Sequence, residues 1–359
     1  MRFLDIIGGW INRHFSNEEA IYLVALLLVM FGLLFTLGGV LAPVLSGLVL
    51  AFLLDGLVKK IADLGVPSWL CVYLVFTLFL GAMVALVLFL APLVWQQLRA
   101  LIIGLPGAFD RVRALLMTFA ESSPGFITTA QVEQWLSTLT SDVANLSGTL
   151  LNNLLNEFPE VVAPMLYAVI VPFSVFFFLK DREQLIKWFL SLLPRERPLL
   201  IRVGEEMNVQ LANYVRGKFA EILIVGSLTF VTFTLFGLNY AALLSVLVGL
   251  SVLIPFVGAA VVTIPVALVA TVQFGWSLPF AGVFGAYLVI QFLDGNFLVP
   301  LLFSNAVNLH PITIVSAVLA FGGLWGVWGV LFAIPLATLV KAIYTAWPRQ
   351  DKEPAVEAS

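Results

Sequence analysis

The sequence has few charged residues. Of its 359 residues only 11% are Asp, Glu, Lys or Arg, whereas 61% are hydrophobic and the mean hydropathy is +1.05. A soluble domain carries about 25% charged residues. Runs of about 20 apolar residues, long enough to cross roughly 30 Å of hydrocarbon as a helix, recur along the chain. This composition excludes a soluble globular protein and predicts an all-α, polytopic integral membrane protein.

Cysteine and catalytic motifs are also scarce. Cys71 is the only cysteine, which excludes an intramolecular disulfide and argues against a thiolate metal site, so we expect it to be a small core residue. No H-E-x-x-H, G-x-S-x-G or Walker A motif is present. We therefore predict that the protein is not an enzyme and holds no metal or cofactor. The net charge of −3 and the lack of a basic block argue against nucleic acid, which leaves membrane lipid as the expected surroundings.

The N-terminal membrane region, residues 1–95, is predicted to contain three spans at about 20–37, 40–58 and 66–95. A turn is expected at Gly38 and Gly39. No cleavable signal is evident, so the first span is expected to remain as an anchor. Asp55 lies one turn before Lys59, and we expect an interfacial ion pair between them.

The middle of the chain becomes amphipathic. Residues 96–159 are predicted to form an extracytoplasmic domain of two helices, the first interrupted at Gly104–Pro106 and the second within 128–158. A fourth span is expected at 160–180, and basic amphipathic helices at 181–218. The positive-inside rule places the basic helices in the cytoplasm, and the four spans before them then place the N-terminus there. Lys341, Arg349 and Lys352 predict that the polar tail at 346–359 is also cytoplasmic.

Residues 219–345 are predicted to be a transport core made of five apolar segments, at 222–238, 241–254, 257–273, 278–293 and 312–341. Because both ends of this core are expected in the cytoplasm, at least one segment should be broken or re-entrant. The candidate breaks are Pro255, Gly258, Pro300, Pro311, Gly322, Gly323 and Pro335. A weak repeat between residues 258–272 and 329–343 supports this interpretation, since paired interrupted segments often mark a transporter's binding site. Two ordinary proline-kinked helices are the alternative.

Asp294 is the only carboxylate between Glu221 and the C-terminal tail. An Asp at the centre of a spanning helix costs about 2.5–3.5 kcal/mol on insertion scales, so such a residue is usually functional. We predict that Asp294, Gln291 and Asn296 form the polar lining of a solute or ion pathway. The two amides are expected to hydrogen-bond to the carboxylate or to a polar solute, and Asp294 to bind the coupling proton or cation if one is used. The alternative is a turn residue that caps the next helix.

Two further residues are candidates for the pathway. His310 precedes Pro311 and is either a pathway residue or a turn residue at the interface. Glu221 follows Arg216 and Lys218 on the same helix, and we expect it to form an ion pair at a helix start near the cytoplasmic face, with a gating role as the alternative.

The C-terminal half resembles the autoinducer-2 exporter family, the PerM-like permeases. The similarity rests on LANYVRGKFAEILIVG (211–226), FGLNYAALLSVLVGLSVLIPFVGA (236–259) and the block from Leu298 to Lys341 that closes with GVWGVLFAIPLATLVK. This resemblance implies about eight transmembrane helices, a location in the bacterial inner membrane and homo-oligomers. We predict a secondary transporter or exporter of a small polar solute, such as the quorum-sensing signal autoinducer-2, coupled to protons or sodium if to any ion. The alternatives are a sodium/proton antiporter of the same family and a non-transporting membrane scaffold.

Overall fold

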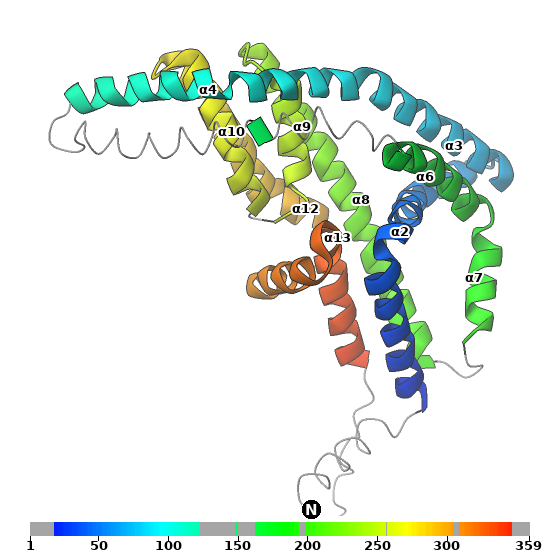
Figure 1. Ribbon diagram of the computed structural model, residues 1–359. Helices are drawn as coiled ribbons and strands as arrows, with labels where there is room; N and C mark the ends of the chain where they lie inside the picture. Colours follow the sequence, from blue (N-terminus) through cyan, green and yellow to red (C-terminus); the bar gives the residue numbers. More distant parts are fainter. Residues whose placement is uncertain are drawn as a thin grey trace, which may run out of the picture. The chain divides into compact units, whose positions relative to one another are not determined.

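All regular structure in the described part of the chain is helical (Figure 1). The computed structural model describes residues 18–122, 148–149, 162–193, 198–255, 257–303 and 309–346. Five helical segments are long and apolar enough to cross a membrane, and shorter apolar helices accompany them. The prediction of an all-α polytopic membrane protein is confirmed. The second helix expected within 128–158, apart from residues 148–149, and the polar tail beyond residue 346 lie outside the described residues.

The chain divides into two compact units. The first comprises Met1–Val72, Ile170–Val215 and Asn305–Ser359, and the second comprises Tyr73–Val169 and Arg216–Ser304. The dividing points fall inside helices, so α3, α6 and α8 each contribute residues to both units. The bounds of these three helices are Ser68–Ala85, Val162–Lys180 and Pro198–Leu235.

The first unit begins with α2 (Glu18–Ala62), a continuous helix of 45 residues. The turn predicted at Gly38 and Gly39 is therefore wrong. Gly38 instead lets a neighbour approach, because a Cβ at this position would lie 2.7 Å from Nε1 of Trp325. At about 1.5 Å per residue α2 is roughly 68 Å long. Because residues 20–58 form one helix, they no longer predict two membrane crossings. The number of spans before the basic helices is then uncertain by one, and it no longer places the N-terminus in the cytoplasm.

Two predicted local features of the first unit are confirmed. Asp55 Oδ2 lies 3.0 Å from Lys59 Nζ, and Asp55 Oδ1 lies 3.5 Å from Nε of Arg182 at the start of α7 (Arg182–Ser191). Cys71 is buried, and its thiol donates a weak hydrogen bond to the carbonyl of Val66 at 3.5 Å. The aspartate therefore connects the end of α2 with the start of α7.

In the second unit, α3 continues through a π-helical turn (Leu86–Leu90) into α4 (Ala91–Ser122). The interruption expected at Gly104–Pro106 is wrong, since α4 is helical through Pro106. A proline removes one backbone hydrogen bond, and the regular helix on both sides tolerates that loss here. Gln97 of α4 accepts a hydrogen bond from the backbone N–H of Leu243, at 2.8 Å.

The core of the second unit is built from α8 and from three apolar helices that follow it. These are α9 (Ala241–Ser251), α10 (Val257–Phe274) and α11 (Leu278–Leu293). The buried residues of this core are Val225, Phe233, Leu238, Leu244, Val248, Val252, Val262, Val266, Val269, Ala270, Val283, Tyr287 and Ile290. Seven of these thirteen residues are valines, so branched aliphatic side chains dominate the packing between the helices.

The helix pair α9–α10 is a hairpin closed by a tight turn at residues 252–255. Pro255 lies in this turn, and Gly258 is the second residue of α10. A Cβ on Gly258 would overlap the carbonyl oxygen of Ser251, so only glycine allows the two arms to come this close. The break expected here is present.

A second hairpin is formed within α13 (Pro311–Ala346) of the first unit. Its one non-helical residue is Gly326, with φ 58° and ψ −138°. The break expected at Gly322 and Gly323 is therefore wrong in position, because both residues are helical and the chain turns three residues after Gly323. A Cβ on Gly329 would overlap the carbonyl oxygen of Phe321. Ala317 of the first arm packs with Ala333 and Ala337 of the second. The weak sequence repeat thus corresponds to two glycine-closed helical hairpins.

Candidate functional site

Two opposite charges lie buried in the middle of α8. Lys218 Nζ is 2.8 Å from Glu221 Oε2, and the two side chains are 10% and 2% exposed. Residues three apart lie on the same face of a helix. The expected ion pair is present, but its expected position at a helix start is wrong, because α8 begins twenty residues earlier at Pro198.

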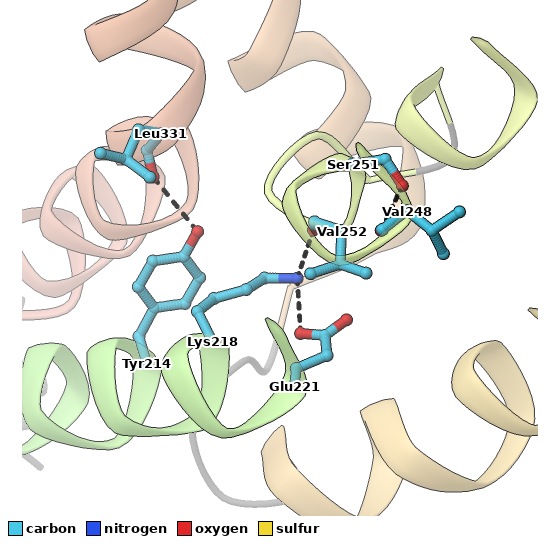
Figure 2. Close-up of polar contacts among 7 residues, drawn as sticks. All are labelled: Tyr214, Lys218, Glu221, Val248, Ser251, Val252 and Leu331. Carbon is cyan, nitrogen blue, oxygen red and sulfur yellow. Dashed lines mark hydrogen bonds and ion pairs between the residues drawn. The ribbon is translucent and has the colours of Figure 1, made fainter. Parts of the chain in front are cut away.

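The amine of Lys218 has two further neighbours in the second unit. It donates a hydrogen bond of 2.8 Å to the carbonyl of Val252, the C-cap residue of α9, and lies 5.2 Å from the centre of the Phe303 ring. Figure 2 shows the amine between this carbonyl and the Glu221 carboxylate. The last carbonyls of a helix have no partner within the helix, and they carry its partial negative charge. The break after α9 therefore supplies a ligand for the buried ammonium.

Asp294 lies in a continuous helical segment formed by α11, a π-helical turn called η3 (Asp294–Leu298) and α12 (Val299–Phe303). The alternative in which it caps a new helix is therefore wrong. The break expected at Pro300 is wrong, because Pro300 is helical within α12. The irregularity lies before it, in the π-helical turn, where the N–H of Val299 bonds to the carbonyl of Asp294. Single π-helical turns inside α-helices occur frequently at functional sites.

The carboxylate of Asp294 borders an apolar cavity of about 200 Å³ between α8 and the α11–α12 segment. The lining residues are Ile224, Val225, Leu228, Ile290, Leu293, Asp294, Phe297, Leu298 and Leu301. Oδ1 of Asp294 is buried and accepts no hydrogen bond from the described residues. Asp294 is close enough to interact electrostatically with Lys218 and with Glu221. These three residues form the candidate site.

The predicted amide partners do not contact the Asp294 carboxylate. Gln291 Nε2 donates to the hydroxyl of Tyr287 at 3.1 Å, and the exposed Asn296 donates to the carbonyl of Phe292 at 2.9 Å. Tyr287 in turn bonds to Thr263 of α10 at 2.7 Å. Gln291 is thus part of a polar chain between α10 and α11, whereas Asn296 bonds only within its own helix.

The remaining predicted residues lie elsewhere. His310 is exposed in the first unit, where its carbonyl accepts the N–H of Thr313 at 2.8 Å and its ring Nδ1 accepts that of Ile312 at 3.3 Å. It is the residue before α13 and acts as a cap. Pro311 is the first residue of α13, a position where a missing N–H is harmless, and Pro335 lies within its second arm.

Sequence reasoning missed three buried polar groups. Lys218 was considered only as a surface partner of Glu221, although the apolar residues that follow it already suggest burial. Tyr287 is fully buried and hydrogen-bonded, and nothing in its apolar neighbourhood distinguishes it from a packing residue. Thr229 is also fully buried, two turns after Glu221, and its hydroxyl has no hydrogen-bond partner among the described residues.

The site can exchange a proton or hold a cation. It combines two carboxylates, one ammonium and the Val252 carbonyl at the end of α9 in apolar surroundings, where an uncompensated charge is expensive. The described residues contain no group of three or more His, Cys, Asp or Glu side chains that could hold a metal ion. This chemistry suits an ion-linked binding site.

Comparison with known proteins identifies membrane transport proteins similar to this chain. The sequence profile described as AI-2E family transporter matches residues 23–349. PerM of Escherichia coli (strain K12), named as a permease, is 43% identical over 345 residues, which cover 96% of this chain and 98% of PerM. YueF of Bacillus subtilis (strain 168), named as a transport protein, is 26% identical over 310 residues, covering 84% of this chain and 82% of YueF. Because the profile and PerM both match nearly the whole length, the chain belongs to the AI-2E transporter family, a family of membrane permeases.

Proposed function

We propose that this protein is a secondary transporter that exports a small polar solute, with Asp294 as the group that takes up a coupling proton or cation. One observation supports this most strongly: the Asp294 carboxylate has an oxygen without a hydrogen-bond partner among the described residues and lies near the buried Lys218–Glu221 pair. A carboxylate in such surroundings is stabilised by binding a proton or a cation.

Autoinducer-2 is the first solute to test, because family membership suggests it. A sodium/proton antiporter is the second candidate function, favoured by the three ionisable groups of the site. A scaffold without transport activity needs no buried charges, so the same groups argue against it. We also propose, from the resemblance alone, homo-oligomers in a bacterial inner membrane. The C-terminus is proposed to be cytoplasmic because Lys341 and the basic residues beyond it follow the last apolar segment.

The test is flux in proteoliposomes that contain the full chain. Vesicles are loaded with autoinducer-2, and its release is measured with and without an imposed proton or sodium gradient. Asp294→Asn keeps the shape of the side chain and removes its charge. We expect the variant to lower flux by at least about tenfold, the change expected when roughly 1.4 kcal/mol of interaction is lost.

Asp63→Asn is the matched control, since it makes the same chemical change at an exposed aspartate after α2. It should transport like the unchanged protein. Proton movement driven by a sodium gradient, without release of autoinducer-2, would favour the antiporter. Unchanged flux and ion dependence in Asp294→Asn would show that this carboxylate is not on the pathway.

A further inference from the structure

The surroundings of the Lys218 amine are those of a bound cation. A carboxylate oxygen and a backbone carbonyl oxygen each lie 2.8 Å from Nζ, and an aromatic face lies 5.2 Å away. Carboxylates, free carbonyls at a helix C-terminus and aromatic faces all attract positive charge. The three groups come from α8, from the end of α9 and from α12, so the fold positions them independently of the lysine side chain.

The charges near the amine do not balance. Lys218 supplies one positive charge, whereas Glu221 and Asp294 supply two carboxylates. Glu221 is 1% exposed, and its Oε2, although close to the amine, accepts no well-oriented hydrogen bond from the described residues. Without the amine, both carboxylates would be buried with no cation among their contacts.

The protein ligands suit a monovalent cation better than a divalent one. Calcium takes six to eight oxygen ligands and magnesium requires six in octahedral geometry. Among the described residues, the Glu221 carboxylate and the Val252 carbonyl are the oxygen groups that contact the amine, and the Phe303 ring occupies another side. This is enough for a single positive charge.

We propose that the Lys218 ammonium is a tethered occupant of a monovalent cation site formed by Glu221, Val252 and Phe303. The consequence of this inference for transport rests on the proposed function. Because the ammonium fills the site, sodium cannot bind there as the coupling ion, and a proton on Asp294 or Glu221 remains as the alternative. Removing the amine leaves the site open to an alkali cation.

Lys218→Met tests this, because methionine fills much of the same volume without charge. The full-length variant is purified in detergent, and its Tm is measured in increasing NaCl or KCl and in N-methylglucamine chloride at equal ionic strength. We expect a saturating rise in Tm of several degrees with NaCl or KCl only, and no such rise for the unchanged protein.

Two controls accompany the variant. Lys187→Met removes the lysine of another Lys–Glu pair on a helix, in which both side chains are exposed, and should show no cation-specific rise. Lys218→Met combined with Glu221→Gln removes the carboxylate ligand and should lose the rise as well. If Lys218→Met does not fold, Lys218→Asn replaces it, since its shorter amide leaves room for an ion and can bond to Glu221.

Absence of a cation-specific rise in the folded Lys218 variant, or an equal rise in the unchanged protein, would overturn the proposal. The measurement reports binding and does not depend on transport, so it can succeed even if flux of autoinducer-2 is never found. Conversely, flux that depends on Asp294, together with a cation-insensitive Lys218 variant, would leave the proposed function standing and remove this inference alone.

Discussion

At the scale of single residues, the two carboxylates of the site differ in what stabilises them. Glu221 is paired with Lys218 on its own helix, whereas Asp294 has an oxygen without a hydrogen-bond partner among the described residues. Asp294 was predictable from sequence because it is a lone charge in a long apolar region. The proximity of Asp294 to Lys218 was not predictable, because these residues are far apart in the sequence and come together only when α11 packs against α8.

The Lys218–Glu221 pair should show strong energetic coupling. Removing one partner of a buried pair costs about 3–5 kcal/mol, because the other charge remains buried. Lys218→Met should destabilise more than Glu221→Gln, since the first leaves two carboxylates without a cation and the second leaves Asp294 near the ammonium. The double variant should be more stable than Lys218→Met alone. Unfolding in detergent, in a buffer free of sodium and potassium, measures all three.

Additive effects in this double-mutant cycle would contradict the pairing. Exposed ion pairs typically contribute only about 0–1 kcal/mol, so the pair Glu183–Lys187 on α7 is a suitable control. Its cycle should give a coupling close to zero.

At the scale of helices, sequence patterns located elements better than breaks. The apolar run at Leu278–Leu293 was predicted with the observed bounds of α11, because turn residues flank it on the N-terminal side and a charge follows it. The turn at Gly38 and Gly39 was wrong because glycine is tolerated in membrane helices, where it lets another side chain approach. In α13 several glycines lie close together, and sequence alone does not say that Gly326 adopts the positive φ.

Glycines that close the two hairpins and glycines that face open space should respond in opposite ways to substitution by alanine. Gly258→Ala and Gly329→Ala each place a Cβ onto a backbone carbonyl oxygen of the opposite arm, so both should destabilise the protein and reduce flux. Gly285→Ala and Gly323→Ala add a Cβ where no atom lies within 4 Å, and each should be neutral or stabilising by up to about 1 kcal/mol. Unfolding temperatures in detergent and flux in proteoliposomes provide the comparison. Wild-type stability in Gly258→Ala would contradict the tight closure of the α9–α10 hairpin.

At the scale of the whole molecule, the two hairpins fall in different compact units, and α8 contacts a hairpin in each. Within the first unit, Tyr214 of α8 donates a hydrogen bond of 3.2 Å to the carbonyl of Leu331, just after the break at Gly326. Within the second unit, Lys218 bonds to Val252 at the break of the other hairpin (Figure 2). One helix thus supplies a polar side chain to a backbone carbonyl at each break, an arrangement that the sequence repeat only suggested.

Topology is the remaining property of the whole chain that the structure makes testable. The contact between Asp55 and Arg182 places the end of α2 and the start of α7 on the same side of the membrane. Basic residues lie at both places: Lys59 and Lys60 in the last turn of α2, and Lys180 in the last turn of α6, directly before α7. The positive-inside rule therefore places both in the cytoplasm. We propose that the chain between them leaves through α3 and returns through α6, a path that keeps both basic ends on one side.

We therefore expect the segment after α4 to be outside and α7 to be inside. Cys71→Ser gives a background without cysteine, and a serine hydroxyl can donate to the same carbonyl of Val66. In this background Ser123→Cys should react with a membrane-impermeant maleimide on intact cells. Ser191→Cys, at an exposed position at the end of α7, should react only after the cells are permeabilised. Labelling of both positions from one side would contradict this topology, because α6, the apolar helix between them, could not then cross the membrane.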